Sequence, residues 1–513
     1  MAASRRCGIL CHPTSLPSDY GIGDLGSGAE QFIAYLESAG QTIWQVLPLG
    51  PTGYGDSPYQ PFSAFAGNHL LISPELLAAD GLLTQSELEG ARVAPGGRID
   101  YGTLIVSRTA LLQRSYERFL ASSSNWELLD DFREANRAWL DDYALFMALK
   151  ARFELTSWHT WPREIALRKP AAMAGWCSEV IEQISFHRYL QLQFHRQWQR
   201  VRELARNAGI SLIGDMPIFV GHDSADVWAH RELFQLDEAG MPRAVAGVPP
   251  DAFSPTGQLW GNPLYDWAQL ARTDYAWWVA RLQHALALVD EVRLDHFRGF
   301  AGYWQVPAGD PTAEGGRWVK GPGAAFFASV REQLGALPII AEDLGLISAD
   351  VIALRQELGL PGMRVLQFAF DSDAANEHLP HNWERDLVTY TGTHDNNTTL
   401  GWYAAASPAM RSRVRAYVGD VAQMNWAFIR LALNSVADTV VIPLQDVLGL
   451  GAEARLNTPG NPGGNWQWRC EAAQLTPDSV ARLASMSQAA NRSHAPGQAP
   501  AVNEPAVLDY AVE

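Results

Sequence analysis

Four carboxylates in this sequence each follow a short apolar run. They are Asp215 in IGDMP, Asp295 in VRLDHF, Glu342 in IIAEDLG and Asp395 in GTHDNN. Two carboxylates that flank one bond can cleave a glycoside, one as general acid and the other as nucleophile or as base for a water. A single Asp at a strand end is as often a helix cap or the partner of a nearby Arg. The repetition on four separate runs favours one shared catalytic pocket.

The alternation of side chains along a strand assigns directions to some of these residues. Arg293 and Asp295 are two positions apart, so both should point into the fold while Leu294 points outward. An inward guanidinium would lower the pKa of Asp295 and keep it ionised, as a nucleophile requires. The apolar approach to Glu342 would raise its pKa, which suits a general acid. Asp343 should face the other way, in a structural role.

Asp395 and its neighbour His394 form a third candidate group. Asp395 could hold sugar hydroxyls and stabilise an oxocarbenium-like transition state. For His394, a hydrogen-bonded histidine of the core is the alternative. Retaining chemistry needs the two reacting carboxyl groups about 5 Å apart and inverting chemistry a wider gap. The sequence leaves that distance open.

Eight short apolar runs have the composition of buried parallel strands, and segments of helical period lie between most of them. A (β/α)8 barrel needs eight strand–helix units, whereas a doubly wound sheet usually has fewer strands and often a Gly-rich phosphate turn, which this sequence lacks. We therefore predict an α/β fold, a (β/α)8 TIM barrel whose mouth gathers the four carboxylates. The runs are residues 8–11, 42–49, 211–220, 291–297, 338–344, 362–370, 387–393 and 439–446.

The chain of 513 residues is long for a barrel alone. We predict a single catalytic barrel over residues 1–487, with inserted subdomains at about 70–184 and 221–267. The first insertion is rich in helix formers and too long for one crossover. The second is rich in Gly, Pro, Trp and Asp, as expected for an irregular loop that binds substrate over the barrel mouth. Residues 488–513 are predicted to be a loosely attached C-terminal tail.

The composition restricts the possible partners. A net charge of −17 without any Lys/Arg cluster argues against nucleic acid and against an anionic membrane surface. A neutral substrate fits better, and some of the 19 tryptophans could stack on sugar rings, although most should lie in the core. Neither a signal peptide nor a run of about 18 apolar residues is recognisable, so we predict a cytoplasmic protein. Cys7, Cys11 and His12 could suggest a metal site, but buried strand thiols are the favoured interpretation.

Three of the segments described above, VRLDHF, AEDLG and GTHDNN, resemble active-site segments of the α-amylase superfamily. The whole chain resembles the amylomaltases, or 4-α-glucanotransferases. The Asp215 segment lacks the Asn-His that often follows this Asp in amylases, which favours the amylomaltase branch. Supporting segments extend over most of the chain, namely HPTSLPSDYGIGDLG at 12–26, WQVLPLGPTGYGDSPYQ at 44–60, IGDMPIFV at 213–220, GVPPDAFSPTGQLWGNPLYDW at 247–267 and LNTPGNPGGNWQWR at 456–469.

The resemblance implies transfer of α-1,4-glucan segments to the 4-OH of glucose or a maltodextrin by retaining double displacement. It implies Asp295 as nucleophile, Glu342 as acid/base and Asp395 as transition-state stabiliser. The expected substrates are maltooligosaccharides and fragments of starch or glycogen, with no cofactor and no metal, since the calcium site of many amylases has no visible counterpart. An α-glucan hydrolase with the same carboxylates is the alternative. A glucan-binding barrel without activity is less favoured.

The resemblance also implies a set of sugar-binding residues. The loop Pro249–Gly257, which contains Asp251, corresponds to a flexible loop over the acceptor sites, and transfer requires that this loop exclude water. Tyr54 and Tyr101 match a pair that forms a remote glucan-binding site in some members of the family. Around the sugar next to the scissile bond, the implied binders are Tyr59, Asp215, Arg293 and His394.

Overall fold

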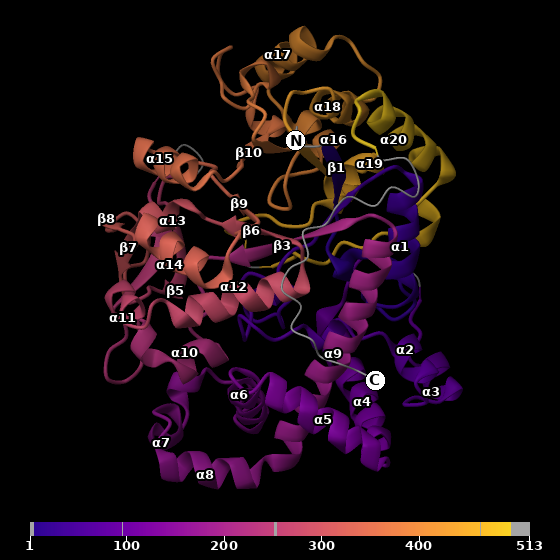
Figure 1. Ribbon diagram of the computed structural model, residues 1–513. Coiled ribbons are helices and arrows are strands. Elements are labelled where there is room, and N and C mark those ends of the chain that lie inside the picture. Colours follow the sequence, from indigo (N-terminus) through magenta and orange to yellow (C-terminus); the bar gives the residue numbers. More distant parts are fainter. Residues whose placement is uncertain (1–4, 95, 251–253, 462, 494–513) are drawn as a thin grey trace.

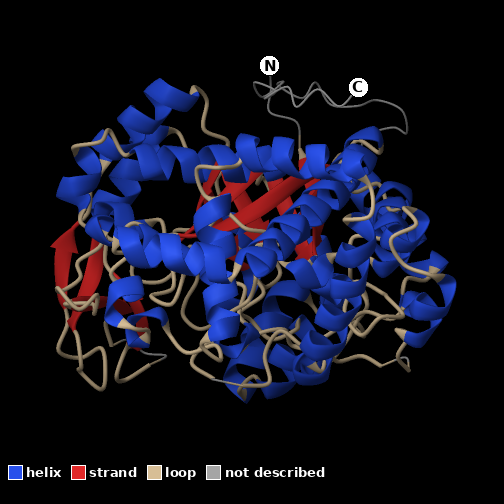
Figure 2. Ribbon diagram, turned by 90° about the horizontal axis from the view of Figure 1, so that it is seen from below, coloured by secondary structure: helices blue, strands red, loops and turns tan. Residues whose placement is uncertain are grey.

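The computed structural model describes residues 5–94, 96–250, 254–461 and 463–493. Within them, eight parallel strands form one sheet in the order β10-β11-β12-β1-β2-β3-β6-β9. Each predicted run overlaps one of these strands, so the predicted (β/α)8 barrel is confirmed. The strands lie at the centre of the molecule with helices around them (Figures 1 and 2). Their bounds are β1 Arg6–Leu10, β2 Ile43–Gln45, β3 Ser211–Pro217, β6 Glu291–Asp295, β9 Ile339–Ala341, β10 Gly362–Val365, β11 Leu387–Tyr390 and β12 Thr439–Pro443.

The end strands β9 and β10 are joined by two hydrogen bonds in place of a ladder. The Ala341 N–H donates to the Pro361 carbonyl at 2.9 Å. The Met363 N–H donates to Asp343 Oδ1 at 2.6 Å. The Nε atom of Arg355 lies 3.2 Å from the other Asp343 oxygen. Asp343 therefore has the structural role predicted for it, because its carboxylate connects the two strands that close the barrel.

The strands are apolar because both of their faces are covered, by side chains inside the barrel and by helices outside it. All five residues of β12 are buried. The long helix α9, Ile181–Asn207, buries Tyr189, Trp198 and Val201 on the face expected from their spacing. It ends at Asn207, two residues before Gly209, whose φ of 70° a residue with a side chain rarely adopts.

Helices connect most consecutive barrel strands. Between β10 and β11 the chain forms two short 3-10 helices, Leu366–Phe368 and Pro380–Asn382, and no α-helix, so this unit departs from the regular barrel repeat. The helices around the barrel are α1 Ser27–Ser38, α9, α12 Ala276–Leu288, α14 Ala324–Leu334, α15 Ala349–Leu358, α16 Thr399–Ala405, α17 Pro408–Val418, α18 Met424–Leu433, α19 Leu444–Val447 and α20 Pro477–Ala489.

The connection between β2 and β3 is mainly helical, in agreement with the helix-rich composition of residues 70–184. These helices occupy the lower part of Figure 1. Whether they form a separate subdomain stays a prediction. The helices that precede α9 are α2 Pro74–Ala79, α3 Gln85–Gly90, α4 Tyr101–Phe119, α5 Ser123–Ala135, α6 Leu140–Arg152, α7 Arg163–Ala166 and α8 Pro170–Glu179.

A second, antiparallel sheet lies beside the barrel, at the left of Figure 1. Its strands, in spatial order, are β5 Gln258–Pro263, β4 Ala244–Val248, β7 Gly302–Pro307 and β8 Arg317–Lys320. Residues 221–267 are therefore more regular than the irregular loop expected, and they also contain α10 Ala225–Ala229 and the start of α11 Trp267–Ala271. Local sequence patterns did not indicate this sheet, because β4 pairs with β7, more than fifty positions later in the chain.

Residues 488–493, which the sequence assigns to the tail, are attached to the barrel. Arg492 is buried, and its guanidinium donates to five carbonyl oxygens at 2.7 to 3.2 Å, among them that of Arg6 at the start of β1. Residues 494–513 lie outside the described residues.

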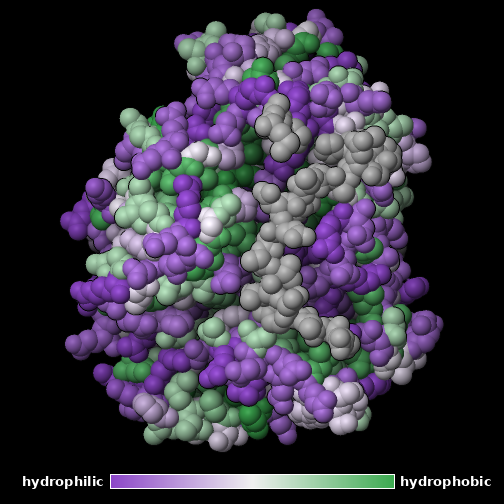
Figure 3. Space-filling view, viewed as in Figure 1, coloured by the Kyte–Doolittle hydropathy of each residue, from purple (hydrophilic) through white to green (hydrophobic). Residues whose placement is uncertain are grey.

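The face of the molecule in Figure 3 is mostly hydrophilic, with smaller apolar patches. In the described part of the chain, no helix combines the length and apolar character needed to cross a membrane.

Candidate active site

Arg293 joins two of the four carboxylates at the mouth of the barrel. It lies on β6 opposite Asp215 of β3 in the ladder. Its Nη1 is 2.7 Å from Asp215 Oδ2, and its Nη2 is 2.8 Å from Asp295 Oδ1. The side chains of Arg293 and Asp295 therefore point the same way, as their spacing predicts. Asp215 has no exposed side-chain surface while that of Asp295 is 28% exposed, so Asp295 is the carboxylate of the two that a substrate can reach.

The net effect on Asp295 differs from the prediction. Burial, the largest influence, raises the pKa of Asp295 above its ordinary range. Arg293 lowers this pKa as expected, and the charge of Asp215 raises it again. The predicted net lowering is wrong because loss of hydration outweighs the ion pair. Direct contact with Arg293 still keeps the pKa of Asp295 lower than it would be without a cation beside this carboxyl group.

Glu342, which directly follows β9, is held by backbone N–H groups. Its Oε2 accepts from the His296 N–H and its Oε1 from the Leu344 N–H, each at 2.8 Å. Its own carbonyl accepts from the Phe297 N–H at 3.2 Å. His296 has φ 52°, in the left-handed region that residues with side chains seldom occupy. This turn directly after Asp295 therefore ties the ends of β6 and β9 together.

The surroundings of Glu342 suit a general acid. Burial raises its pKa to about 7, and the nearby charge of Asp295 adds to this effect while Arg293 opposes it. Glu342 therefore retains a proton up to neutral pH. This agrees with the raised pKa that the apolar run before Glu342 predicts. Two carboxyl groups of one mouth thus differ in their partners, a guanidinium for Asp295 and backbone amides for Glu342.

Tyr59 and His394 form an aromatic wall next to the carboxylates. Their rings are stacked, with centroids 5.0 Å apart and planes 15° from parallel. The Tyr59 hydroxyl donates to Asp215 Oδ2 at 2.7 Å, and His394 Nε2 lies 3.3 Å from Asp395 Oδ1. The structure therefore gathers all the residues predicted around the scissile bond. Because the Asp215 carboxylate is covered by Tyr59 and Arg293, it orients these two side chains, and this burial argues against its predicted direct contact with sugar.

Three residues that the sequence analysis did not assign support Asp395 and the aromatic wall. The Asn457 side-chain amide donates to Asp395 Oδ1 at 2.6 Å, and Arg455 donates to the Asp395 carbonyl at 2.7 Å. The Trp466 ring lies 5.8 Å from that of Tyr59. Asn457 and Trp466 belong to the segment LNTPGNPGGNWQWR. Its content of Asn and Trp is the sequence feature that could have indicated their role in the site. Their targets are far away in the sequence, Asp395 in the loop after β11 and Tyr59 in the connection after β2.

The loop Pro249–Gly257 connects β4 to β5. Asp251, the residue predicted to bind substrate there, lies outside the described residues. The Thr256 carbonyl accepts from the Ala313 N–H at 3.1 Å, which attaches the end of this loop to the segment before β8. Trp260, on β5 and also unassigned by the sequence analysis, contacts the His296 ring edge to face with centroids 4.8 Å apart.

Tyr54 and Tyr101 differ sharply in accessibility. Tyr54 is 80% exposed, whereas Tyr101 is 5% exposed. The Tyr101 hydroxyl donates to the Trp466 carbonyl at 3.1 Å. Burial and the nearby Asp56 raise its pKa, so it stays a neutral phenol. Tyr101 therefore supports Trp466, and its buried ring does not provide the open stacking face that a remote glucan site formed with Tyr54 would need.

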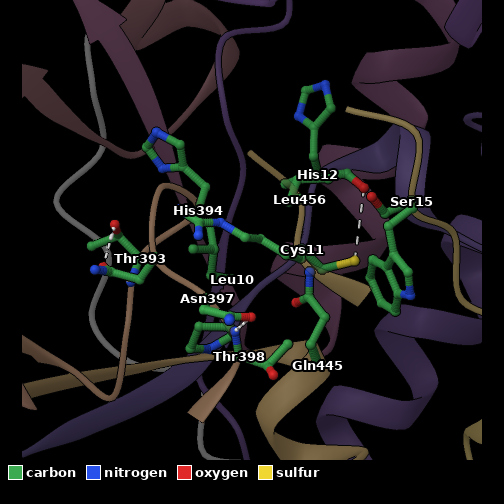
Figure 4. Close-up of a pocket in the computed structure, with 14 residues that line it drawn as sticks. Leu10, Cys11, His12, Ser15, Thr393, His394, Asn397, Thr398, Gln445 and Leu456 are labelled. Carbon is green, nitrogen blue, oxygen red and sulfur yellow. Dashed lines mark hydrogen bonds between the residues drawn. The ribbon is translucent and has the colours of Figure 1, made fainter. Parts of the chain in front are cut away.

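A pocket beside the aromatic wall is lined by His12, His394, Asn397, Thr398 and Gln445, among others (Figure 4). The Leu47 N–H donates to His12 Nδ1 at 3.3 Å. Burial lowers the pKa of His12 to about 3, so the ring is neutral with its proton on Nε2.

Cys7 and Cys11 are buried thiols of the first strand region, as favoured by the sequence analysis.

Comparison with known proteins agrees with this geometry. Residues 11–475 match the family model described as 4-alpha-glucanotransferase. The chain belongs to the 4-α-glucanotransferase family. This family includes a Thermus thermophilus protein named 4-alpha-glucanotransferase, which is 49% identical over 503 residues, covering 96% of this chain and all of that protein. The family resemblance stated from the sequence is thereby confirmed.

Two further relatives show how widely the 4-α-glucanotransferase pattern extends. A Solanum tuberosum protein named 4-alpha-glucanotransferase, chloroplastic/amyloplastic, is 46% identical over 476 residues, covering 91% of this chain and 82% of the relative. The solved amylomaltase from Streptococcus agalactiae in complex with acarbose superposes with a TM-score of 0.94 and is 38% identical. That match covers 96% of this chain and all of the other, so the barrel and its surrounding helices are shared.

Proposed function

We propose that this chain transfers segments of α-1,4-glucan to the 4-OH of glucose or of a maltodextrin, by a retaining double displacement. Membership of the 4-α-glucanotransferase family establishes an enzyme that acts on α-1,4-glucans. The observation that carries the mechanism is the unequal pair of carboxyl groups. Asp295 contacts the Arg293 guanidinium, whereas Glu342 is held by backbone N–H groups and has a pKa of about 7.

In the first step, an Asp295 oxygen attacks the anomeric carbon of the glucan while the glycosidic C–O bond breaks. Glu342 gives its proton to the departing oxygen, which leaves as the 4-OH of the released segment. The result is a glucosyl group bound covalently to Asp295. In the second step, the 4-OH of an acceptor sugar attacks the same carbon and gives its proton to Glu342. Asp295 is released and an α-1,4 bond forms again.

The other residues of the mouth act on the sugar next to the broken bond. The Asp395 carboxylate, 43% exposed and fixed by Asn457, is placed to hold sugar hydroxyls and to stabilise the positive charge of the transition state. His394 lies beside it and shares this task. Tyr59 supplies an aromatic face for the sugar ring, and Arg293 keeps Asp295 in position.

Transfer and hydrolysis use the same first step, so the acceptor of the second step decides the activity. Incubation of the purified protein with maltotriose separates the two. Transfer gives glucose together with a ladder of longer maltodextrins, because one maltotriose supplies the segment and another receives it. A stoichiometric increase in reducing ends without longer products would contradict the proposal and favour an α-glucan hydrolase.

The proposed substrates are maltooligosaccharides and fragments of starch or glycogen. Acarbose, a compound present in the Streptococcus agalactiae amylomaltase structure, supports a site for sugar chains in this fold. A cytoplasmic location stays a prediction. The lack of a nucleic-acid partner also stays a prediction, which the net charge of −17 supports.

A further inference from the structure

An exposed tryptophan lies on the edge strand of the second sheet, held in a fixed position. Trp318 of β8 is 44% exposed. The Arg298 guanidinium carbon lies 3.8 Å from the centroid of its ring, and Trp304 of β7 contacts it edge to face with centroids 5.2 Å apart. Trp304 is itself fixed, because its indole N–H donates to the Ala313 carbonyl at 2.8 Å. The large exposed ring is therefore already ordered.

Arg298 connects Trp318 to the acid/base side of the catalytic centre. It begins α13, Arg298–Ala301, three residues after Asp295 and directly after Phe297, whose N–H donates to the Glu342 carbonyl. Its Nη1 donates to the Leu346 carbonyl. Leu346 is two residues beyond Leu344, whose N–H holds the Glu342 carboxyl group. Trp318 is thus linked through Arg298 to the two turns that position Glu342.

The side of Glu342 is the side of the leaving group and of the acceptor. A general acid must reach the glycosidic oxygen of the departing segment, which therefore extends from the broken bond past Glu342. Leu346, whose carbonyl accepts from Arg298, is 52% exposed. The indole face of Trp318 stabilises the buried charge of Arg298 together with the carbonyl oxygens of Leu346 and Gly302. This fixes one face of Trp318 against the protein and leaves the remaining surface for a ligand.

We propose that Trp318 is a stacking platform for a glucose unit of the leaving or acceptor glucan, beyond the unit that is joined at the scissile bond. The platform rests on the proposed transfer activity and adds a preference for longer acceptors. Aromatic faces bind the apolar C–H face of a sugar ring, and an ordered ring loses little entropy on binding. A glucose acceptor occupies the position at the bond and gains nothing from Trp318, whereas a longer acceptor gains this contact.

The test compares acceptors of different length in the full-length enzyme. With a fixed donor, transfer to glucose and to maltoheptaose is measured for the wild type, Trp318→Ala, Trp318→Phe and Trp126→Ala. Trp126 of α5 is a matched control because it is 43% exposed and lies in the helical region away from β8 (Figure 1). We expect Trp318→Ala to raise the KM for maltoheptaose roughly fivefold to tenfold more than the KM for glucose. Trp318→Phe should fall between, and Trp126→Ala should match the wild type.

Binding without turnover gives a second measurement. In an Asp295→Asn background, Trp318→Ala should weaken the Kd for maltoheptaose roughly fivefold or more by calorimetry. Equal losses for glucose and maltoheptaose, or no loss for either, would overturn the platform. If Trp318→Ala unfolds, the comparison of Trp318→Phe with the wild type decides in the same way. A wild type that transfers to neither acceptor would instead overturn the proposed function, so the two failures are distinguishable.

Discussion

The ends of β6 and β9 carry the same chemical group in different surroundings. Asp295 at the end of β6 contacts a guanidinium that it shares with Asp215. Glu342 after β9 accepts two hydrogen bonds from backbone N–H groups and has no cation in contact, and burial raises its pKa to about 7. Both groups are partly desolvated, so the difference lies in their partners. The cation opposes the rise in pKa that burial causes at Asp295, whereas the two amide hydrogen bonds and the more distant Arg293 lower the pKa of Glu342 less than burial raises it, which fits the proposed nucleophile and proton donor.

The largest expected effect comes from removing the proposed nucleophile of this pair. Asp295→Asn preserves the size of the side chain and removes the negative oxygen that attacks the sugar, so kcat should fall on the order of 10⁴-fold or more. The product ladder from maltotriose measures the loss. The unfolding midpoint serves as control and should stay close to that of the wild type. Near-normal turnover of the variant would rule out Asp295 as the nucleophile.

Removing the proposed proton donor should have an effect that depends on the leaving group. Glu342→Gln should lower kcat/KM for maltotriose roughly 10³-fold, since an unprotonated sugar oxygen leaves poorly. Fluoride needs no proton, so the first turnover of an α-maltosyl fluoride should be affected much less. In the wild type, kcat/KM for maltotriose should fall as the pH rises above about 7, where Glu342 loses its proton. Equal losses for maltotriose and the fluoride would assign the acid to another group.

Removing the shared cation, Arg293, should change the rate least and the stability most among these three substitutions. Arg293→Gln leaves Asp215 and Asp295 together without a counter-charge, and the folded state should lose about 3–5 kcal/mol. Because the pKa of Asp295 then rises further above its unfolded value, the loss should be small at acidic pH and grow as the pH increases through the folded pKa. Urea unfolding at pH 5 and pH 8 measures it, with Arg293→Lys as the control that retains a charge. Identical losses of unfolding free energy at both pH values would contradict this role of Arg293 as the counter-charge of Asp295.

Much of the barrel and the centre of the site followed from the sequence. The eight apolar runs predicted the eight strands, because a parallel strand covered on both faces is apolar along its length. The i, i+2 spacing predicted that Arg293 and Asp295 point the same way, and the apolar run before Glu342 predicted its raised pKa. The second sheet could not be predicted in this way, because β4 and β7 are joined by pairing across a long stretch of chain.

Local periodicity and motif are properties of neighbouring residues, so the sequence by itself determined the strands, the family and the four carboxylates. The tertiary structure alone decided what surrounds each of them. It places Asn457 on Asp395, buries Tyr101 beneath Trp466, covers Asp215 and raises the pKa of Asp295 despite its arginine. The physical reason is that burial and electrostatic fields sum over groups from distant segments, which approach one another only when the barrel has closed.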